Sequence, residues 1–271
     1  MANAALPVNR ARGKSDGMNR ITRNNRNAAP QSGKFVRLWG RHAVTAAMTN
    51  PARTIRKIWA VREVLAEMQL PPVIQVNPSG NGDLAALVPP GAPHQGIVAE
   101  VEPLDERWID EFLDLPVDDR RPIIILDQVT DPQNVGAILR SAAAFDAHAL
   151  ITQDRHSPPE SGVIARAASG ALETMAWLRV VNLARALDQL AEGGFWRIGL
   201  DGRASNSLSS ALGGNVRPAL VMGAEGTGLR PNSAEHCDQL AKLPISRRME
   251  SLNVSNAAAI ALYAAAEMRN I

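Results

Sequence analysis

Hydrophobic residues in the second half of the chain come in short runs that predict alternating strands and helices. The near-continuous apolar run 123–129 predicts a strand buried on both faces, and 134–145 predicts a helix with one apolar face. Further strands are expected at 149–152, 177–181, 195–200, 219–222 and 240–245, with helices at 161–172, 183–191 and 254–270. This alternation predicts an α/β fold with a mostly parallel sheet and helices on both faces.

The preceding region predicts a smaller α/β unit at 35–102. Order is expected to begin near Phe35, and a stretch that ends in Gly40 leads into a short helix. Strands are expected at 55–61, 73–76 and 96–101, helices at 42–48 and 62–68, and a helical turn at 84–87. Proline pairs at 71–72 and 89–90 mark the loops of this unit.

An acidic segment separates the two regions, which we divide as a linker at 103–121 and a second domain at 122–271. Between Glu100 and Asp119 there are nine acidic residues and one base, Arg107. Apolar residues at 108, 109, 112 and 113 recur at helical spacing, so we expect an amphipathic linker helix that packs on a domain. The negative charge makes this segment a poor binding site for RNA.

The first 34 residues form a basic segment. They carry seven basic residues and one acid, a net charge of +6, so the rest of the chain carries −4 of the total +2. Few large apolar residues are present to offset the ordering entropy, which predicts a disordered tail. Two interpretations stay open for this tail: a solvated solubility arm, or an electrostatic arm that binds nucleic acid.

Composition narrows the class of protein. A chain of 271 residues suggests two domains or one large one, and 45% hydrophobic with 21% charged residues is typical of a soluble globular protein. No apolar run reaches the roughly 18 residues of a membrane span, and no secretion signal is present, so a cytoplasmic location is expected. A single cysteine, Cys237, excludes a disulfide framework and a cysteine zinc cluster. Aromatic residues at 4% argue against a stacking platform for bases.

Candidate chemistry lies in the loops that follow the strands, because ligands of open α/β sheets bind at the carboxyl ends of the strands. In the first loop, Asn134 is either a helix cap or a site residue, Gly136 permits a close approach, and Arg140 is either a surface charge or a functional group. The third loop precedes the last helix, where Ser251 or Asn253 is either a helix cap or a site residue.

The second loop, 222–229, holds three glycines. It brings the backbone close to a ligand or is a flexible turn. It fits neither a Walker loop nor a dinucleotide fingerprint, which argues against a nicotinamide-dependent oxidoreductase, and Glu225 within it argues against phosphate binding. No loop supplies a hydrolase triad, and no cluster has the spacing of metal ligands, so no metal is expected.

Together the three loops resemble the motifs of the SpoU family, also described as TrmH-like, which are RNA ribose 2′-O-methyltransferases of the knotted SPOUT class. The resemblance covers 122–271 and rests on the runs Asn134-x-Gly136-x-x-x-Arg140, Gly223-x-Glu225-Gly226 and Ser251-Leu252-Asn253-Val254-Ser255. Residues 36–101, with His94-Gln95-Gly96-Ile97, resemble the small substrate-binding domain of the family's bacterial 23S rRNA guanosine 2′-O-methyltransferases. The basic tail is not part of the common pattern.

The resemblance implies S-adenosylmethionine as methyl donor, bound by backbone groups near Gly223, Leu243, Ile245 and Leu252. It implies a trefoil knot in the C-terminal segment. The position after the first strand of this region holds no glycine, which favours the knotted class over a conventional Rossmann methyltransferase.

The resemblance also places Arg140 at the reacting ribose hydroxyl, either as a base or as a group that stabilises phosphate and developing alkoxide. It implies that Asn134, Glu225, Ser251 and Asn253 orient the ribose, Arg140 and the cofactor.

Finally, the resemblance implies an RNA partner and a homodimer. The arginine then acts in its own subunit's site or across the interface, and the alanine-rich last helix is an interface element or only a core element. A 23S rRNA guanosine is the expected target. A tRNA ribose is the alternative substrate, and a non-catalytic RNA-binding or ribosome-assembly protein is the alternative function.

Overall fold

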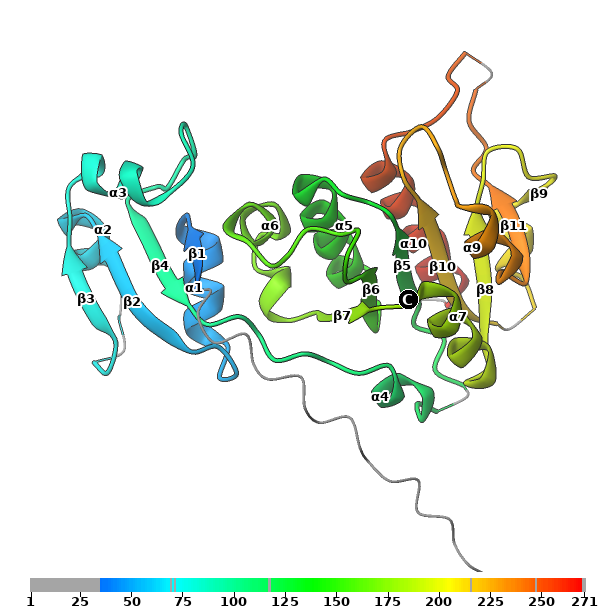
Figure 1. The fold of residues 1–271 in the computed structure, drawn as a ribbon, viewed down its shortest axis with the longest axis horizontal. Coiled ribbons are helices and arrows are strands. Elements are labelled where there is room, and N and C mark those ends of the chain that lie inside the picture. The colour runs from blue at the N-terminus through cyan, green and yellow to red at the C-terminus, as the bar shows by residue number, and fades with distance from the viewer. Residues whose placement is uncertain are drawn as a thin grey trace, which may run out of the picture. The chain divides into compact units, whose positions relative to one another are not determined.

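A computed structural model describes residues 35–68, 70, 72–116, 118–214, 216–246 and 248–269. The predicted disordered tail at 1–34 lies outside the described residues. Figure 1 shows two sheets, one formed before and one after the acidic segment.

The larger sheet has seven strands in the order β7-β6-β5-β10-β8-β11-β9, and every neighbouring pair is parallel. The strands are β5 (Ile123–Asp127), β6 (Ala149–Gln153), β7 (Ala176–Val180), β8 (Phe195–Leu200), β9 (Asn206–Ser207), β10 (Arg217–Gly223) and β11 (Gln239–Lys242). Every residue of β5 is buried, including Asp127 at its end, as the near-continuous apolar run predicts.

Helices cover both faces of this sheet. They are α5 (Pro132–Ala144), α6 (Gly162–Ala168), α7 (Leu183–Glu192), α8 (Leu208–Ala211), α9 (Pro231–Glu235) and α10 (Val254–Met268). Successive strand residues point to opposite faces. Ile124 and Leu126 therefore pack with α5 and α10, whereas Ile123 and Ile125 pack with α7. The prediction of a mostly parallel sheet flanked by helices is confirmed.

Three details of the predicted elements are wrong. Asp131 caps α5 by accepting from the Gln133 amide at 3.0 Å, so Asn134 is not the cap. The helix expected at 161–172 ends at Ser169, where φ is +49°, and a 3-10 turn, η1 (Ala171–Glu173), follows. The short elements β9, α8 and α9 were not predicted, because each has too few residues to show a period.

The smaller sheet has four strands in the order β1-β4-β2-β3. Its strands are β1 (Val36–Trp39), β2 (Ile55–Ala60), β3 (Gln75–Pro78) and β4 (Ile97–Val101), and its helices are α1 (Arg41–Thr49), α2 (Arg62–Glu67) and α3 (Asn81–Leu87). Strand β4 runs antiparallel to β1 and β2, and β3 is parallel to β2. A turn at 72–74 delays β3 by two residues from its predicted start.

The acidic segment contributes only one helical turn, α4 (Asp110–Leu113). Phe112 is buried there in the core beside α7, whereas Trp108 is 59% exposed. The predicted amphipathic helix is therefore only one turn long, and only part of its predicted apolar face is buried. Within the described residues, no helix combines the length and the apolar character needed to cross a membrane.

The close packing of α5 on α6 generates the first prediction. A Cβ at Gly136 would lie 2.5 Å from the Ala167 Cβ and 2.7 Å from the Ile164 carbonyl oxygen. We expect Gly136→Ala to lower the free energy of unfolding by about 1–3 kcal/mol in urea titrations, since the added methyl overpacks the contact. Gly202→Ala is the control, because nothing lies within 4 Å of that position. Equal stability of the two variants would contradict this account of Gly136.

Candidate functional site

Two of the candidate loops leave the large sheet side by side. Asp127 at the end of β5 is paired in register with Gly223 at the end of β10. The loop after β5 therefore begins next to the glycine-rich loop after β10. The carboxyl edge of the sheet thus brings together segments about 100 residues apart in the sequence.

Glu225 joins the three candidate loops. Its Oε1 atom accepts from the Asn253 side-chain amide at 2.6 Å, from the Asn134 amide at 3.4 Å and from the backbone N–H of Val254 at 3.3 Å. The Asn253 amide also donates to Asn134 Oδ1 at 3.1 Å. Three of the predicted site residues, Asn134, Glu225 and Asn253, therefore form one hydrogen-bonded cluster.

Asn253 fills both of the roles that its position suggested. Its Oδ1 atom accepts from the Ser255 backbone N–H at 2.9 Å and caps α10. Its amide group points the other way, to Glu225 and Asn134. The cap therefore fixes the side chain that reaches into the cluster.

An ion pair between a buried carboxylate and a partly exposed arginine, which the sequence did not reveal, anchors the glycine-rich loop. Asp127 is fully buried, and its Oδ1 atom lies 2.7 Å from Nε and from Nη2 of Arg230. Its Oδ2 atom accepts from the Arg230 backbone N–H at 3.1 Å. The only signal in the sequence was a carboxylate at the end of an apolar strand, since a buried charge needs a partner.

The glycines of the second loop serve different purposes. A Cβ at Gly223 would lie 2.1 Å from the Gly228 carbonyl carbon and 2.3 Å from the Leu229 nitrogen. The loop's own backbone therefore fills the space beside Gly223, and a side chain at this position would clash with the loop itself. Gly226 and Gly228 have φ values of +80° and +69°, and the space beyond them is open. These two glycines permit the close approach of a ligand.

The remaining predicted site residues lie outside the cluster. Arg140 and Ser251 are exposed, and neither side chain has a hydrogen bond or ion pair among the described residues. Arg140 is six residues beyond Asn134 on α5, about 9 Å along the helix axis. Leu243 and Leu252 are half-buried, and Ile245 is exposed; the Ile245 amide donates to the Leu243 carbonyl at 2.9 Å.

The cluster suits a ligand that donates hydrogen bonds or carries positive charge. Oε1 of Glu225 takes all three bonds described above, and Oε2 has no hydrogen-bond partner among the described residues. That part of the chain also contains no group of three or more histidine, cysteine or acidic residues able to hold a metal ion. The site therefore offers one negative charge, two oriented amides and open backbone.

Comparison with known proteins gives a consistent result. A sequence profile of the SpoU rRNA Methylase family matches residues 121–263. The chain is 36% identical over 240 or so residues to the 23S rRNA (guanosine-2′-O-)-methyltransferase RlmB of Escherichia coli K12, covering 86% of this chain and 98% of the relative. It is 38% identical to the protein of that name from Ralstonia nicotianae, covering 86% and 96%.

Solved structures agree on the fold. The SpoU methyltransferase AviRb from Streptomyces viridochromogenes, in complex with the cofactor AdoMet, superposes with a TM-score of 0.72 at 23% identity. The superposition covers 87% of this chain and 91% of AviRb. The two proteins therefore share a fold.

The hydrogen bond from Val254 to Glu225 generates the second prediction. We expect Glu225→Ala to speed hydrogen exchange of the Val254 amide by about tenfold, because a charge-assisted bond worth about 1.4 kcal/mol or more is lost. NMR-detected exchange measures this directly. Glu235→Ala, which removes an exposed carboxylate on α9, should leave the Val254 rate unchanged. Identical rates in the Glu225→Ala variant and the unmodified protein would show that the cluster does not form in solution.

Proposed function

The chain belongs to the SpoU rRNA methylase family, and from that premise we propose that it methylates the ribose 2′-hydroxyl of a guanosine in 23S rRNA. The donor is S-adenosylmethionine. The observation that carries the proposal is the match to the RlmB proteins over nearly their whole length. The substrate named for these relatives, 23S rRNA, favours rRNA over the alternative of a tRNA ribose. The presence of all the motif residues, including Arg140, favours an enzyme over a non-catalytic RNA-binding protein.

The residues at the carboxyl edge fit this donor. When bound, S-adenosylmethionine supplies an electrophilic methyl group on a positively charged sulfur. Open backbone at Gly226 and Gly228 suits a flat ligand held by main-chain groups, and the free Oε2 atom of Glu225 suits its positive charges. We assign its contacts to backbone groups at Gly223, Leu243, Ile245 and Leu252.

Arg140 is the residue assigned to the reacting hydroxyl. An arginine side chain is a poor base, and its planar fork suits a phosphate oxygen and a developing alkoxide together. We therefore assign Arg140 to binding the RNA phosphate and stabilising the alkoxide. Asn134, Glu225, Asn253 and Ser251 orient the ribose and the donor around it. Action of Arg140 as the base is the alternative.

The two sheets divide the labour in this proposal. Residues 35–102 recognise RNA, 103–121 link the domains, and 122–271 form the methyltransferase domain, with its C-terminal segment tied in a trefoil knot. The separate four-stranded sheet with its own helices supports the first assignment. Ribosomal RNA as substrate supports a cytoplasmic location.

We also propose a homodimer in which α10 lies at the interface. Its Ile260, Tyr263 and Met268 side chains are 44–52% exposed. Apolar side chains exposed along one helix are typical of an interface with another chain. Arg140, exposed on the neighbouring helix α5, would then complete its own subunit's site or the partner's.

Mapping of ribose methylation tests the proposed function. In the source organism, deletion of the gene should remove one 2′-O-methylguanosine from 23S rRNA, and purified protein with S-adenosylmethionine should restore it in vitro. Loss of a tRNA methyl group instead would select the alternative substrate. Unchanged methylation of all RNA would overturn the enzyme assignment.

Substitution of Arg140 tests its role. We expect Arg140→Ala to lower turnover by at least about 100-fold, the usual cost of removing an acid–base or alkoxide-stabilising group. Calorimetry should show an almost unchanged affinity for S-adenosylmethionine. Arg140→Lys keeps the charge but loses the planar fork, so intermediate turnover is expected. Turnover of Arg140→Ala close to that of the unmodified enzyme would remove Arg140 from the mechanism.

A further inference from the structure

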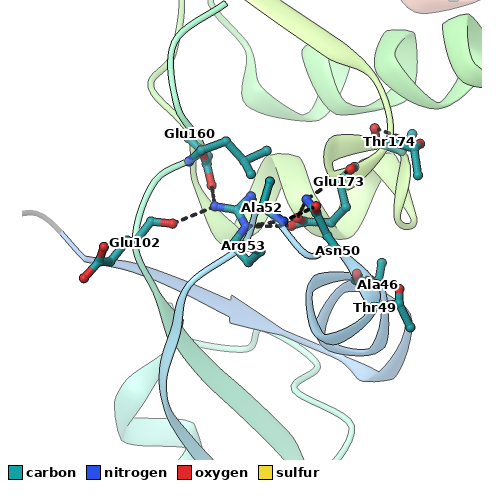
Figure 2. A network of polar contacts seen from close by, with 11 residues as sticks. Ala46, Thr49, Asn50, Ala52, Arg53, Glu102, Glu160, Glu173 and Thr174 are labelled. Atoms are coloured by element: carbon teal, nitrogen blue, oxygen red, sulfur yellow. Dashed lines mark hydrogen bonds and ion pairs between the residues drawn. The ribbon is translucent and has the colours of Figure 1, made fainter. Parts of the chain in front are cut away.

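One arginine from the region of the small sheet is buried among residues of the methyltransferase region. Arg53 lies between α1 and β2, and its side chain is fully buried. Figure 2 shows its guanidinium among Glu160, Glu173 and the carbonyl of Glu102. Nη1 lies 2.6 Å from Glu160 Oε1, and Nη2 lies 2.9 Å from Glu173 Oε1.

The two carboxylates are themselves buried and hydrogen-bonded. Glu160 and Glu173 expose only 13% and 3% of their side chains. The second oxygen of Glu160 accepts from the Leu104 backbone N–H at 3.1 Å. The second oxygen of Glu173 accepts from Arg53 Nε at 3.0 Å and from the Asn50 amide at 2.9 Å. Directional bonds of this kind permit one relative placement of the segments that they join.

Both carboxylates stand on segments that lead to the candidate site. Glu173 ends η1, which contacts α5, the helix of Asn134 and Arg140. Glu160 ends the loop that leaves the carboxyl end of β6. Arg179 holds the rest of that loop by donating to the Asp154 carbonyl at 2.7 Å and the Pro158 carbonyl at 2.8 Å.

A tight apolar contact supports the same placement. A Cβ at Gly162, the first residue of α6, would lie 2.0 Å from the ring of Trp39 and 2.3 Å from the Arg37 carbonyl oxygen. Helix α6 therefore touches β1 at its start, and its later residues pack on Gly136 of α5. Gly162 thus allows α6 to contact β1, and Gly136 allows α5 to contact α6.

We propose that Arg53 is a positioning residue for methyl transfer, which holds the RNA-recognising sheet at one fixed place relative to α5 and the carboxyl edge. The proposal rests on the proposed function, because it needs the small sheet to recognise RNA. Arg53 is too buried to touch RNA itself, so it acts only through the geometry of the two regions. The distance between RNA bound at the small sheet and Arg140 on α5 is then fixed.

A distance measurement combined with kinetics tests the proposal. Spin labels on Glu63→Cys and Arg185→Cys, both exposed and one in each region, report the separation in a Cys237→Ser background. We compare the unmodified enzyme with Arg53→Ala and Arg53→Lys. Arg107→Ala is the matched control, because its ion pair with Glu111 is solvent-exposed and lies within the acidic linker, outside the region assigned to RNA recognition.

The expected result is a narrow distance distribution in the unmodified enzyme and the control, and a broad one in Arg53→Ala. With 23S rRNA, kcat/KM of Arg53→Ala should fall at least about tenfold, since misplacement by about 1 Å can cost up to 100-fold. Affinity for S-adenosylmethionine should stay within about twofold. Arg53→Lys should recover part of both losses, because it restores the charge without the fork.

Several outcomes would overturn the proposal. A broad distribution in the unmodified enzyme, or a narrow one in Arg53→Ala, would show that Arg53 does not hold the two regions. A broad distribution with unchanged kcat/KM would show that the placement does not matter for catalysis. If the unmodified enzyme has a narrow distribution but methylates no RNA, the proposed function fails, and the role of Arg53 in methyl transfer fails with it. The conclusion that Arg53 holds the two regions in one placement would still stand.

Removal of Arg53 leaves two buried carboxylates without their cation, which risks unfolding. The triple variant Arg53→Ala, Glu160→Gln, Glu173→Gln removes those charges together with the arginine. It should fold, bind S-adenosylmethionine and still show the broad distribution and the lower kcat/KM. A narrow distribution in this folded variant would overturn the proposal independently.

Discussion

The ion pair between the buried Asp127 and the partly exposed Arg230 sets the geometry on which the candidate site depends. Apolar packing is not directional, so the cores on the two faces of the sheet hold β5 and β10 together without fixing the path of the loops beyond them. Asp127 binds both the backbone and the side chain of Arg230. The glycine-rich loop is therefore tied to β5 at its exit, and Glu225 is held where Asn134 and Asn253 reach it.

A second buried charge, Arg53, works in the same way at the junction between the two regions. Arg53 binds carboxylates on the loop after β6 and on η1, as Figure 2 shows. At both places a charge is removed from water and must be fully paired, so only one arrangement of the surrounding segments is acceptable. Apolar residues thus build the layers of the protein, and the buried charges of Asp127 and Arg53 orient the segments around them.

Glycines contribute to this architecture mainly through contacts between parts of the chain. Gly136 and Gly162 allow α6 to lie against α5 and β1, and Gly223 allows the second loop to fold back on itself. Gly226 and Gly228, by contrast, face open space. A glycine in a motif is therefore evidence of close approach, and at Gly223 the approaching group is the protein's own backbone.

The order of the longer strands and helices after the acidic segment, the parallel sheet and the identity of the motif residues followed from the sequence alone, because period and turn chemistry are local properties. The cap at Asp131 and the end of helix α6 before Ser169 were missed, since competing local signals a few residues apart differ little in energy. Only the tertiary structure decided the charged partners of Asp127 and Arg53, which are 103 to 120 residues away. No local pattern specifies which of many arginines and carboxylates will meet, because that choice depends on how the whole sheet and its helices pack.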